Sequence, residues 1–150
     1  MFYLLIILLS LSLEGCNYFS SCQKLDLKLI ASSQLNPDIN NRPSPLLINL
    51  YELKSNIPFK NLAFTNLGSQ AYKNLKSSLV DVSEIEIRPS ETKNWLKRIK
   101  RSSNYIGIVA AYRDLEQSKW RQVIAIPKNS YLLHLKVMFE AKRINYRFEN

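Results

Sequence analysis

Alternation of apolar and polar residues at every second position dominates the chain from residue 24 onward. Leu25, Leu27, Leu29 and Ala31 show it first, and a period of two places successive side chains on opposite faces of a strand. The same period recurs in segments 46–53, 82–87, 105–112, 120–126, 131–139 and 144–148. Seven or eight short strands at this spacing predict a mainly β protein, an antiparallel sandwich of two sheets.

Two segments depart from this period. Between residues 57 and 79, apolar residues recur at intervals of three and four, which predicts a short helical insertion after the second strand. Gly68 would divide that insertion into two helices. Residues 91–99 (ETKNWLKRI) fit either a helix or an edge strand, and the pattern alone leaves both open.

The N-terminal segment is apolar from Phe2 to Leu13, interrupted only by two serines. A membrane-spanning helix needs about 20 residues, so this run has instead the length of the apolar core of a secretory signal. The sequence LEGC that ends at Cys16 resembles a bacterial lipobox, although Glu14 is unusual there and the segment has no Lys or Arg. The alternative is an N-terminal core strand or helix with an incidental cysteine.

From the lipobox we expect a lipoprotein signal peptide at 1–15, a lipidated tether at 16–23 and a β-sandwich domain at 24–150. Cys16 would carry covalent diacylglycerol and an N-acyl chain. Because Asn17 rather than Asp follows it, the lipoprotein would be sorted to the outer membrane. Cys22 would be a free thiol in the tether.

Composition excludes several kinds of site. The three glycines are scattered, whereas phosphate-binding loops and dinucleotide fingerprints need clustered glycines. Two cysteines and one distant histidine, His134, give no zinc or iron–sulfur spacing. His134 falls on the polar face of its strand, where we expect an exposed side chain, and no catalytic triad can be built on it. We therefore expect no enzyme activity, no cofactor and no small-molecule substrate.

The net charge of +9 fits a nucleic-acid partner, a membrane surface or a solvated face. Positive charge is most concentrated at residues 93–101, which contain five cations. Trp95 lies inside this run and Tyr105 follows it, and cations with aromatic rings are the residue types of a groove that binds single-stranded nucleic acid. An exported protein rarely meets nucleic acid. We therefore favour a solvated face or attraction to anionic envelope lipid, and expect no nucleic-acid partner.

The segment SSQLNPDINNRPSP (32–45) between the first two strands is a loop punctuated by prolines. Pro37, Pro43 and Pro45 restrict the backbone, so the loop loses less entropy when it docks on a partner. Asp38 and Arg42 would offer directional charge on this stiff support. The alternative is a well-formed turn with no binding role.

Three separated segments, 29–53, 58–67 and 106–126, resemble in sequence and order the TssJ (SciN-like) outer-membrane lipoproteins of type VI secretion systems. The match includes Leu-Asn-Pro-Asp and Arg-Pro-Ser-Pro in the first loop and Ala-Ala-Tyr-Arg-Asp before the Trp-Arg pair. Members often have Gly before the loop arginine, where this chain has Asn41, and a Pro-Gly turn where this chain has Pro89 and Ser90.

The resemblance implies a transthyretin-like sandwich on the periplasmic face of the outer membrane, with no catalytic activity. It implies binding to the periplasmic C-terminal domain of a TssM-like inner-membrane protein, and through it an indirect link to a TssL-like protein. The contact would be made by the first loop, at Leu35, Asn36, Pro37, Asp38, Asn41, Arg42, Pro43, Ser44 and Pro45.

Two alternatives remain open from the sequence. A lipoprotein of another envelope assembly, such as a type IV secretion apparatus, could use the same sandwich for a different partner. A sandwich-fold ligand carrier or enzyme is disfavoured because no convergent polar cluster is evident.

Overall fold

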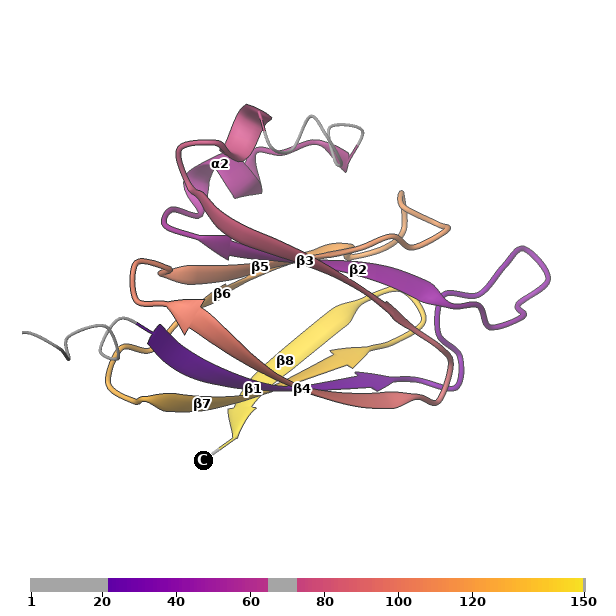
Figure 1. Cartoon of the computed structure of the whole chain (residues 1–150). Coiled ribbons are helices and arrows are strands. Elements are labelled where there is room, and N and C mark those ends of the chain that lie inside the picture. Colours follow the sequence, from indigo (N-terminus) through magenta and orange to yellow (C-terminus); the bar gives the residue numbers. More distant parts are fainter. Residues whose placement is uncertain (1–21, 65–72, 150) are drawn as a thin grey trace, which may run out of the picture.

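The computed structural model describes residues 22–64 and 73–149 and confirms the predicted β-sandwich. Two four-stranded sheets lie face to face, in the orders β4-β1-β7-β8 and β3-β2-β5-β6 (Figure 1). A short helix, α2 (Ile57–Lys60), follows the second strand. The strands are β1 (Cys22–Ala31), β2 (Leu46–Leu53), β3 (Leu79–Ile87), β4 (Thr92–Lys100), β5 (Tyr105–Ala110), β6 (Arg121–Ala125), β7 (Leu132–Phe139) and β8 (Ile144–Glu149).

The core lies between the two sheets and is built by the alternation seen in the sequence. Leu25, Leu27 and Leu29 of β1 are almost fully buried, whereas the residues between them are more exposed. Ile48 and Ile108 face them from the second sheet as part of the same apolar cluster. Each of these side chains, removed completely from water, contributes about 1.5–3 kcal/mol to folding.

Residues 92–99 of the ambiguous segment form an edge strand and not a helix. They belong to β4, which pairs antiparallel with β1. Trp95 and Ile99 face the interior, and Leu96 and Arg98 face solvent, as a period of two requires.

One strand pairing is parallel. β1 also pairs with β7, in a register that places Leu27 beside Leu135, while the other described pairs are antiparallel. The two strands are far apart in the sequence, so no hairpin turn fixes their relative direction. Alternation along a strand likewise carries no information about the direction of its neighbour.

β1 begins at Cys22, two residues before the predicted start of the folded domain at residue 24. Gln23 is buried, and its side-chain amide donates hydrogen bonds to the carbonyl oxygens of Pro127 (2.8 Å) and Ser130 (2.5 Å). These bonds attach the start of β1 to the β6–β7 loop. The sequence gives no sign of them, because both acceptors are backbone atoms more than a hundred residues away.

The helical insertion covers the outer face of the second sheet (Figure 1). Phe59 of α2 is fully buried there against Gly107 of β5, where an added Cβ would lie only 2.7 Å from the phenyl ring. The Arg121 guanidinium donates to the carbonyl oxygens of Phe59 (3.0 Å) and Leu62 (2.7 Å), which satisfies groups at the helix end. A further helical turn covers residues 73–75, and Gly68, the expected break, lies outside the described residues.

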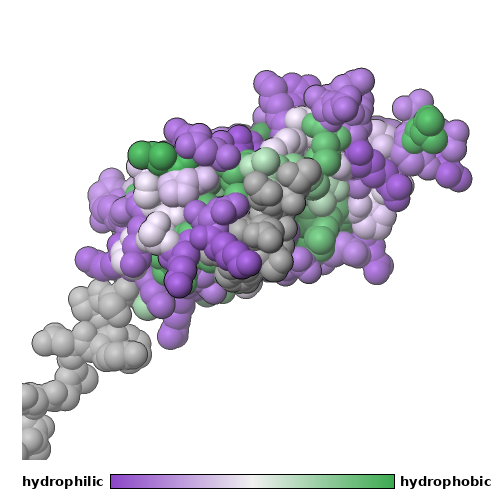
Figure 2. All heavy atoms as spheres, turned by 90° about the horizontal axis from the view of Figure 1, so that it is seen from above, coloured by the Kyte–Doolittle hydropathy of each residue, from purple (hydrophilic) through white to green (hydrophobic). Residues whose placement is uncertain are grey.

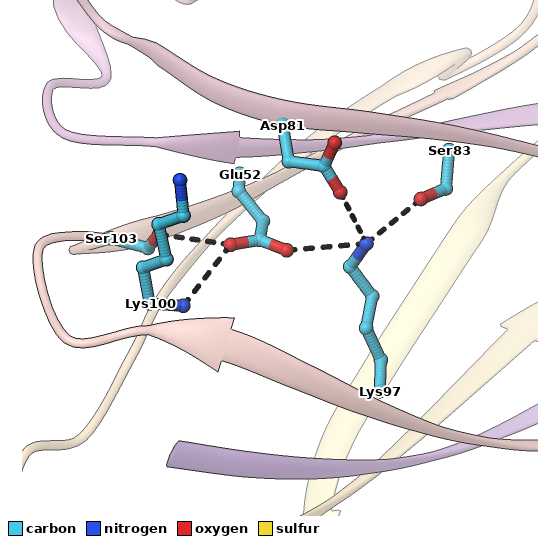
Figure 3. A network of polar contacts seen from close by, with 6 residues as sticks. All are labelled: Glu52, Asp81, Ser83, Lys97, Lys100 and Ser103. Atoms are coloured by element: carbon cyan, nitrogen blue, oxygen red, sulfur yellow. Dashed lines mark hydrogen bonds and ion pairs between the residues drawn. The ribbon is translucent and has the colours of Figure 1, made fainter. Parts of the chain in front are cut away.

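An ion-pair network joins the two sheets at the β3 and β4 edge (Figure 3). Glu52 is 3% exposed, and its carboxylate lies 3.2 Å from the Lys97 ammonium and 3.0 Å from the Ser103 hydroxyl that donates to it. Lys97 also donates to Asp81 (2.6 Å) and Ser83 (2.8 Å). Burial would lower the pKa of Lys97, but its hydrogen bonds to Asp81 and Glu52 outweigh burial and raise that pKa.

Candidate functional site

The β1–β2 loop, residues 32–45, projects from the end of the sandwich where β1 finishes and forms the right-hand extreme of the molecule in Figure 1. Its base is part of the fold. The Leu35 side chain is fully buried in the core, and Ser44 N–H donates to the Leu35 carbonyl at 3.0 Å. Leu35 and Ser44, both predicted as contact residues, therefore hold the loop in place and are not available at its surface.

Asn36 fixes the loop against its neighbour. Its side-chain amide donates to the Pro45 carbonyl (2.8 Å), and its Oδ1 accepts a hydrogen bond from the backbone N–H of Arg113 (2.8 Å) in the β5–β6 loop. Asn36 has φ 46°, in the left-handed region that asparagine tolerates better than most residues. This predicted contact residue is 3% exposed, so it positions the loop.

The tip is organised around the Asp38 carboxylate. One oxygen accepts hydrogen bonds from the backbone N–H groups of Asn40 (2.8 Å) and Arg42 (2.9 Å), and the other accepts one from Arg42 Nε (2.8 Å). These bonds, the one from Arg42 N–H first, hold the pKa of Asp38 below its ordinary value of 3.8. Since the folded-state pKa is lowered, the carboxylate stabilises the loop above pH 3.8 and this stabilisation is lost as the pH falls through the folded value.

Asn41, at the position where the resemblance leads us to expect glycine, has φ 59°, in the left-handed region of the backbone. Both asparagine and glycine adopt this backbone conformation at low cost. The backbone path that the loop needs is therefore retained.

Hydrophilic residues cover the projecting end, with one apolar group among them (Figure 2). Ile39, at the tip, is 96% exposed. Such an apolar side chain, held by a hydrogen-bonded turn, is suited to enter a pocket on a partner. Ile39 is not among the contact residues expected from the sequence, although an isolated apolar residue within a polar loop is a signal of such a role.

A shallow depression of about 700 Å³ lies between this loop and Arg113, Asp114 and Lys142. The Lys142 ammonium lies 2.7 Å from the Asp114 carboxylate and, as the largest influence, lowers the pKa of Asp114. Within the described part of the chain, Arg113 has no carboxylate partner. The depression therefore combines two internal ion pairs, Asp38–Arg42 and Asp114–Lys142, with one unpaired cation. The tertiary structure alone brings these three residues to the loop.

The other sequence candidates lie elsewhere. His134 is exposed, as predicted, on the outer face of the first sheet, where its Nδ1 is 3.0 Å from Asp26 Oδ2. The basic run does not form one groove, because Lys97 points into the inter-sheet network while Arg98 and Lys100 face solvent. Cys16 lies outside the described residues.

Within residues 22–64 and 73–149, no group of His, Cys, Asp and Glu could hold a metal ion. Over the same ranges, no helix has the length and apolar character needed to cross a bilayer.

Comparison with known proteins identifies the family of this chain. A family model, T6SS-SciN, described as type VI secretion lipoproteins (VasD, EvfM, TssJ), matches residues 23–142. The chain belongs to this family. The predicted family is thereby confirmed, and the protein is a structural lipoprotein of type VI secretion, not an enzyme. This family assignment disfavours both alternatives, a lipoprotein of a type IV secretion apparatus and a sandwich-fold ligand carrier.

Two solved structures of type VI secretion proteins share the fold. The type VI secretion lipoprotein TssJ1 from Pseudomonas aeruginosa is 30% identical, with a TM-score of 0.82 over 86% of this chain and 98% of TssJ1. Serratia marcescens Lip, a membrane-bound component of the type VI secretion system, is 22% identical, with a TM-score of 0.77 over 83% and 96% of the two chains. No curated protein sequence is significantly similar to the chain.

A chain in the structure of the TssM C-terminal domain (869–1107) from EAEC is 15% identical, with a TM-score of 0.66 over 82% of this chain and 99% of that one. At this identity the likeness shows the fold alone.

Proposed function

We propose that this lipoprotein is anchored by acylated Cys16 to the periplasmic face of the outer membrane. There it binds the periplasmic C-terminal domain of a TssM-like inner-membrane protein, and through it connects indirectly to a TssL-like protein. The protein would thus join the trans-envelope secretion complex to the outer membrane. The observation that carries this proposal is the prefolded β1–β2 loop at the end of the sandwich opposite to the start of β1 (Figure 1).

The position of the loop fits a bridging role. β1 has ten residues and rises about 3.3 Å per residue, so its two ends are roughly 30 Å apart. An anchor attached before Cys22 would hold one end of the sandwich at the membrane. The other end, with the loop, would then extend toward the periplasm, where an inner-membrane partner can reach it.

The structure also supports the loop as the contact surface on energetic grounds. The Asp38 hydrogen bonds and the Asn36 bridge order the loop before binding, so little conformational entropy remains to be lost. Its exposed residues combine an apolar tip, Ile39, with the charged groups Arg42 and Arg113. This mixture of an apolar anchor with arginine is typical of binding hot spots.

The contact is tested by titrating the purified periplasmic domain of the partner against wild-type protein and the Ile39→Ala, Arg42→Ala and Arg113→Ala variants. Replacing a residue at the centre of a contact by alanine costs about 1–3 kcal/mol of binding free energy, whereas replacing a residue at its rim costs almost nothing. Lys119→Ala is a control, because Lys119 is exposed in the β5–β6 loop but does not line the depression. Thermal melts of Ile39→Ala and Arg113→Ala should be unchanged. Arg42→Ala loses only an exposed ion pair with Asp38, so its melting temperature should fall slightly at most. If all three variants bind with wild-type affinity, the contact lies on another surface.

Anchoring is tested separately with Cys16→Ala. This variant should remain an uncleaved precursor and should not be labelled by an alkyne fatty acid, whereas Cys22→Ala should be processed and labelled normally. Equal labelling of the wild type and Cys16→Ala would refute acylation at this position.

A further inference from the structure

The end of the sandwich where β1 begins carries a basic surface that the partner-binding role does not use. This β1 end comprises the start of β1, the turn between β4 and β5, and the β6–β7 loop (Figure 1). A depression of about 310 Å³ opens there, lined by Cys22, Gln23, Arg101, Lys128, Ser130 and Tyr131.

Two cations, Arg101 and Lys128, line this depression. Two more lie beside lining residues: Lys24 next to the Tyr131 ring, and Lys100 opposite Cys22 in the β1–β4 pairing. No carboxylate of the described residues forms an ion pair with any of them, in contrast to Lys97 and Lys142. Lys128 instead donates hydrogen bonds to the carbonyl oxygens of Arg101 (2.9 Å) and Ser103. Among the described residues, the cations at this end therefore have no carboxylate in a direct ion pair with their side chains.

The cations are held on a fixed support. The buried Gln23 amide attaches the β6–β7 loop to β1, and the Lys24 backbone N–H donates to the Tyr131 carbonyl at 2.8 Å. The Lys24 ammonium also lies 5.4 Å from the centre of the Tyr131 ring. The charges and the aromatic ring thus form one surface before any ligand arrives.

Exposed apolar groups stand beside the charges. Tyr131 is 55% exposed and Leu132 is 38% exposed at the start of β7. Tyrosine favours the membrane–water interface, where its ring meets the acyl boundary and its hydroxyl meets the headgroups. Cations next to tyrosine and leucine match a layer of anionic headgroups above hydrocarbon. A single-stranded nucleic acid fits less well, because it would need several rings aligned for stacking.

We propose that the β1 end docks on the anionic phospholipid headgroups of the membrane that holds the acyl chains of Cys16. This inference rests on the acylation proposed above. Cys22 lies six positions after Cys16, and even a fully extended segment of that length spans only about 20 Å. The tether thus keeps the β1 end within reach of the headgroups, and docking would direct the β1–β2 loop away from the membrane.

Docking is tested with the acylated full-length mature protein in two kinds of vesicle, phosphatidylcholine alone and phosphatidylcholine mixed with phosphatidylglycerol. The readout is the rate at which a soluble maleimide labels Cys22, a free thiol that lines the depression. Each cation near an anionic surface favours the docked state by a factor of about five. We expect labelling to be at least about fivefold slower in the anionic vesicles, and high salt should remove the difference.

The decisive variant is Lys24→Glu with Arg101→Glu, which should label at the same rate in both kinds of vesicle. The control, Arg88→Glu with Lys119→Glu, makes the same charge change at exposed positions away from the depression and should keep the wild-type difference. Equal labelling of the wild type in both vesicles would overturn docking. Slow labelling that persists in the double glutamate variant would assign the protection to another surface and overturn it equally.

Failure of acylation has a different signature. An unacylated protein would lack the acyl mass by mass spectrometry and would not float with vesicles of either composition. An acylated protein that floats but shows no lipid-dependent protection would leave the proposed anchor intact and refute only the docking surface.

Discussion

Replacing Asn36 by alanine isolates the residue that holds the candidate binding loop in place. The substitution removes two hydrogen bonds, to Pro45 and from Arg113, each worth about 1 kcal/mol. It also leaves alanine at φ 46°, which costs roughly 1 kcal/mol more than asparagine there. The sum is a loss of about 3 kcal/mol in the free energy of unfolding, and weaker binding of the partner because the loop is no longer ordered in advance.

Urea denaturation followed by tryptophan fluorescence measures the stability change, and titration of the partner domain measures binding. Asn36→Gly separates the two contributions: it loses the same hydrogen bonds but tolerates the backbone angle, so it should be about 1 kcal/mol more stable than Asn36→Ala. Asn40→Ala is the matched control, since Asn40 is exposed in the same loop. If Asn36→Ala unfolds within about 0.5 kcal/mol of the wild type, the bridge does not stabilise the loop.

Three further substitutions test the packing and the turns. Gly107→Ala should lower the free energy of unfolding by about 1–3 kcal/mol, because the added methyl group forces the Phe59 ring out of its site. Calorimetry should show that the second substitution Phe59→Leu recovers most of that loss. Lys97→Met should lower the free energy of unfolding, measured with denaturant, by about 3 kcal/mol, because the buried Glu52 loses its counter-charge. If adding Glu52→Gln does not make the protein more stable than Lys97→Met alone, this explanation is contradicted. Ser90→Gly should raise stability by about 0.5–1 kcal/mol, because Ser90 has φ 63°, and an unchanged melting temperature would argue against strain there.

The sequence alone determined the layered fold, for a simple physical reason. A strand with one buried face must alternate, and the alternation at Leu25, Leu27 and Leu29 corresponds to core positions in the structure. The prolines and asparagines of residues 32–45 likewise identified the loop, because these residues act on their own backbone. Strands and turns of this kind can be predicted from a sequence because the residues that cause them lie close together in it.

Tertiary structure decided what depends on distant partners. The parallel pairing of β1 with β7 could not be predicted from the sequence, because alternation does not specify the direction of a neighbouring strand. The division of the loop into supporting and exposed residues depends on Arg113, which lies 77 positions after Asn36. The basic β1 end is assembled from β1, the β4–β5 turn and the β6–β7 loop, and its charge appears only when folding brings them together. Such features arise from side chains and backbone groups that meet only in the folded protein.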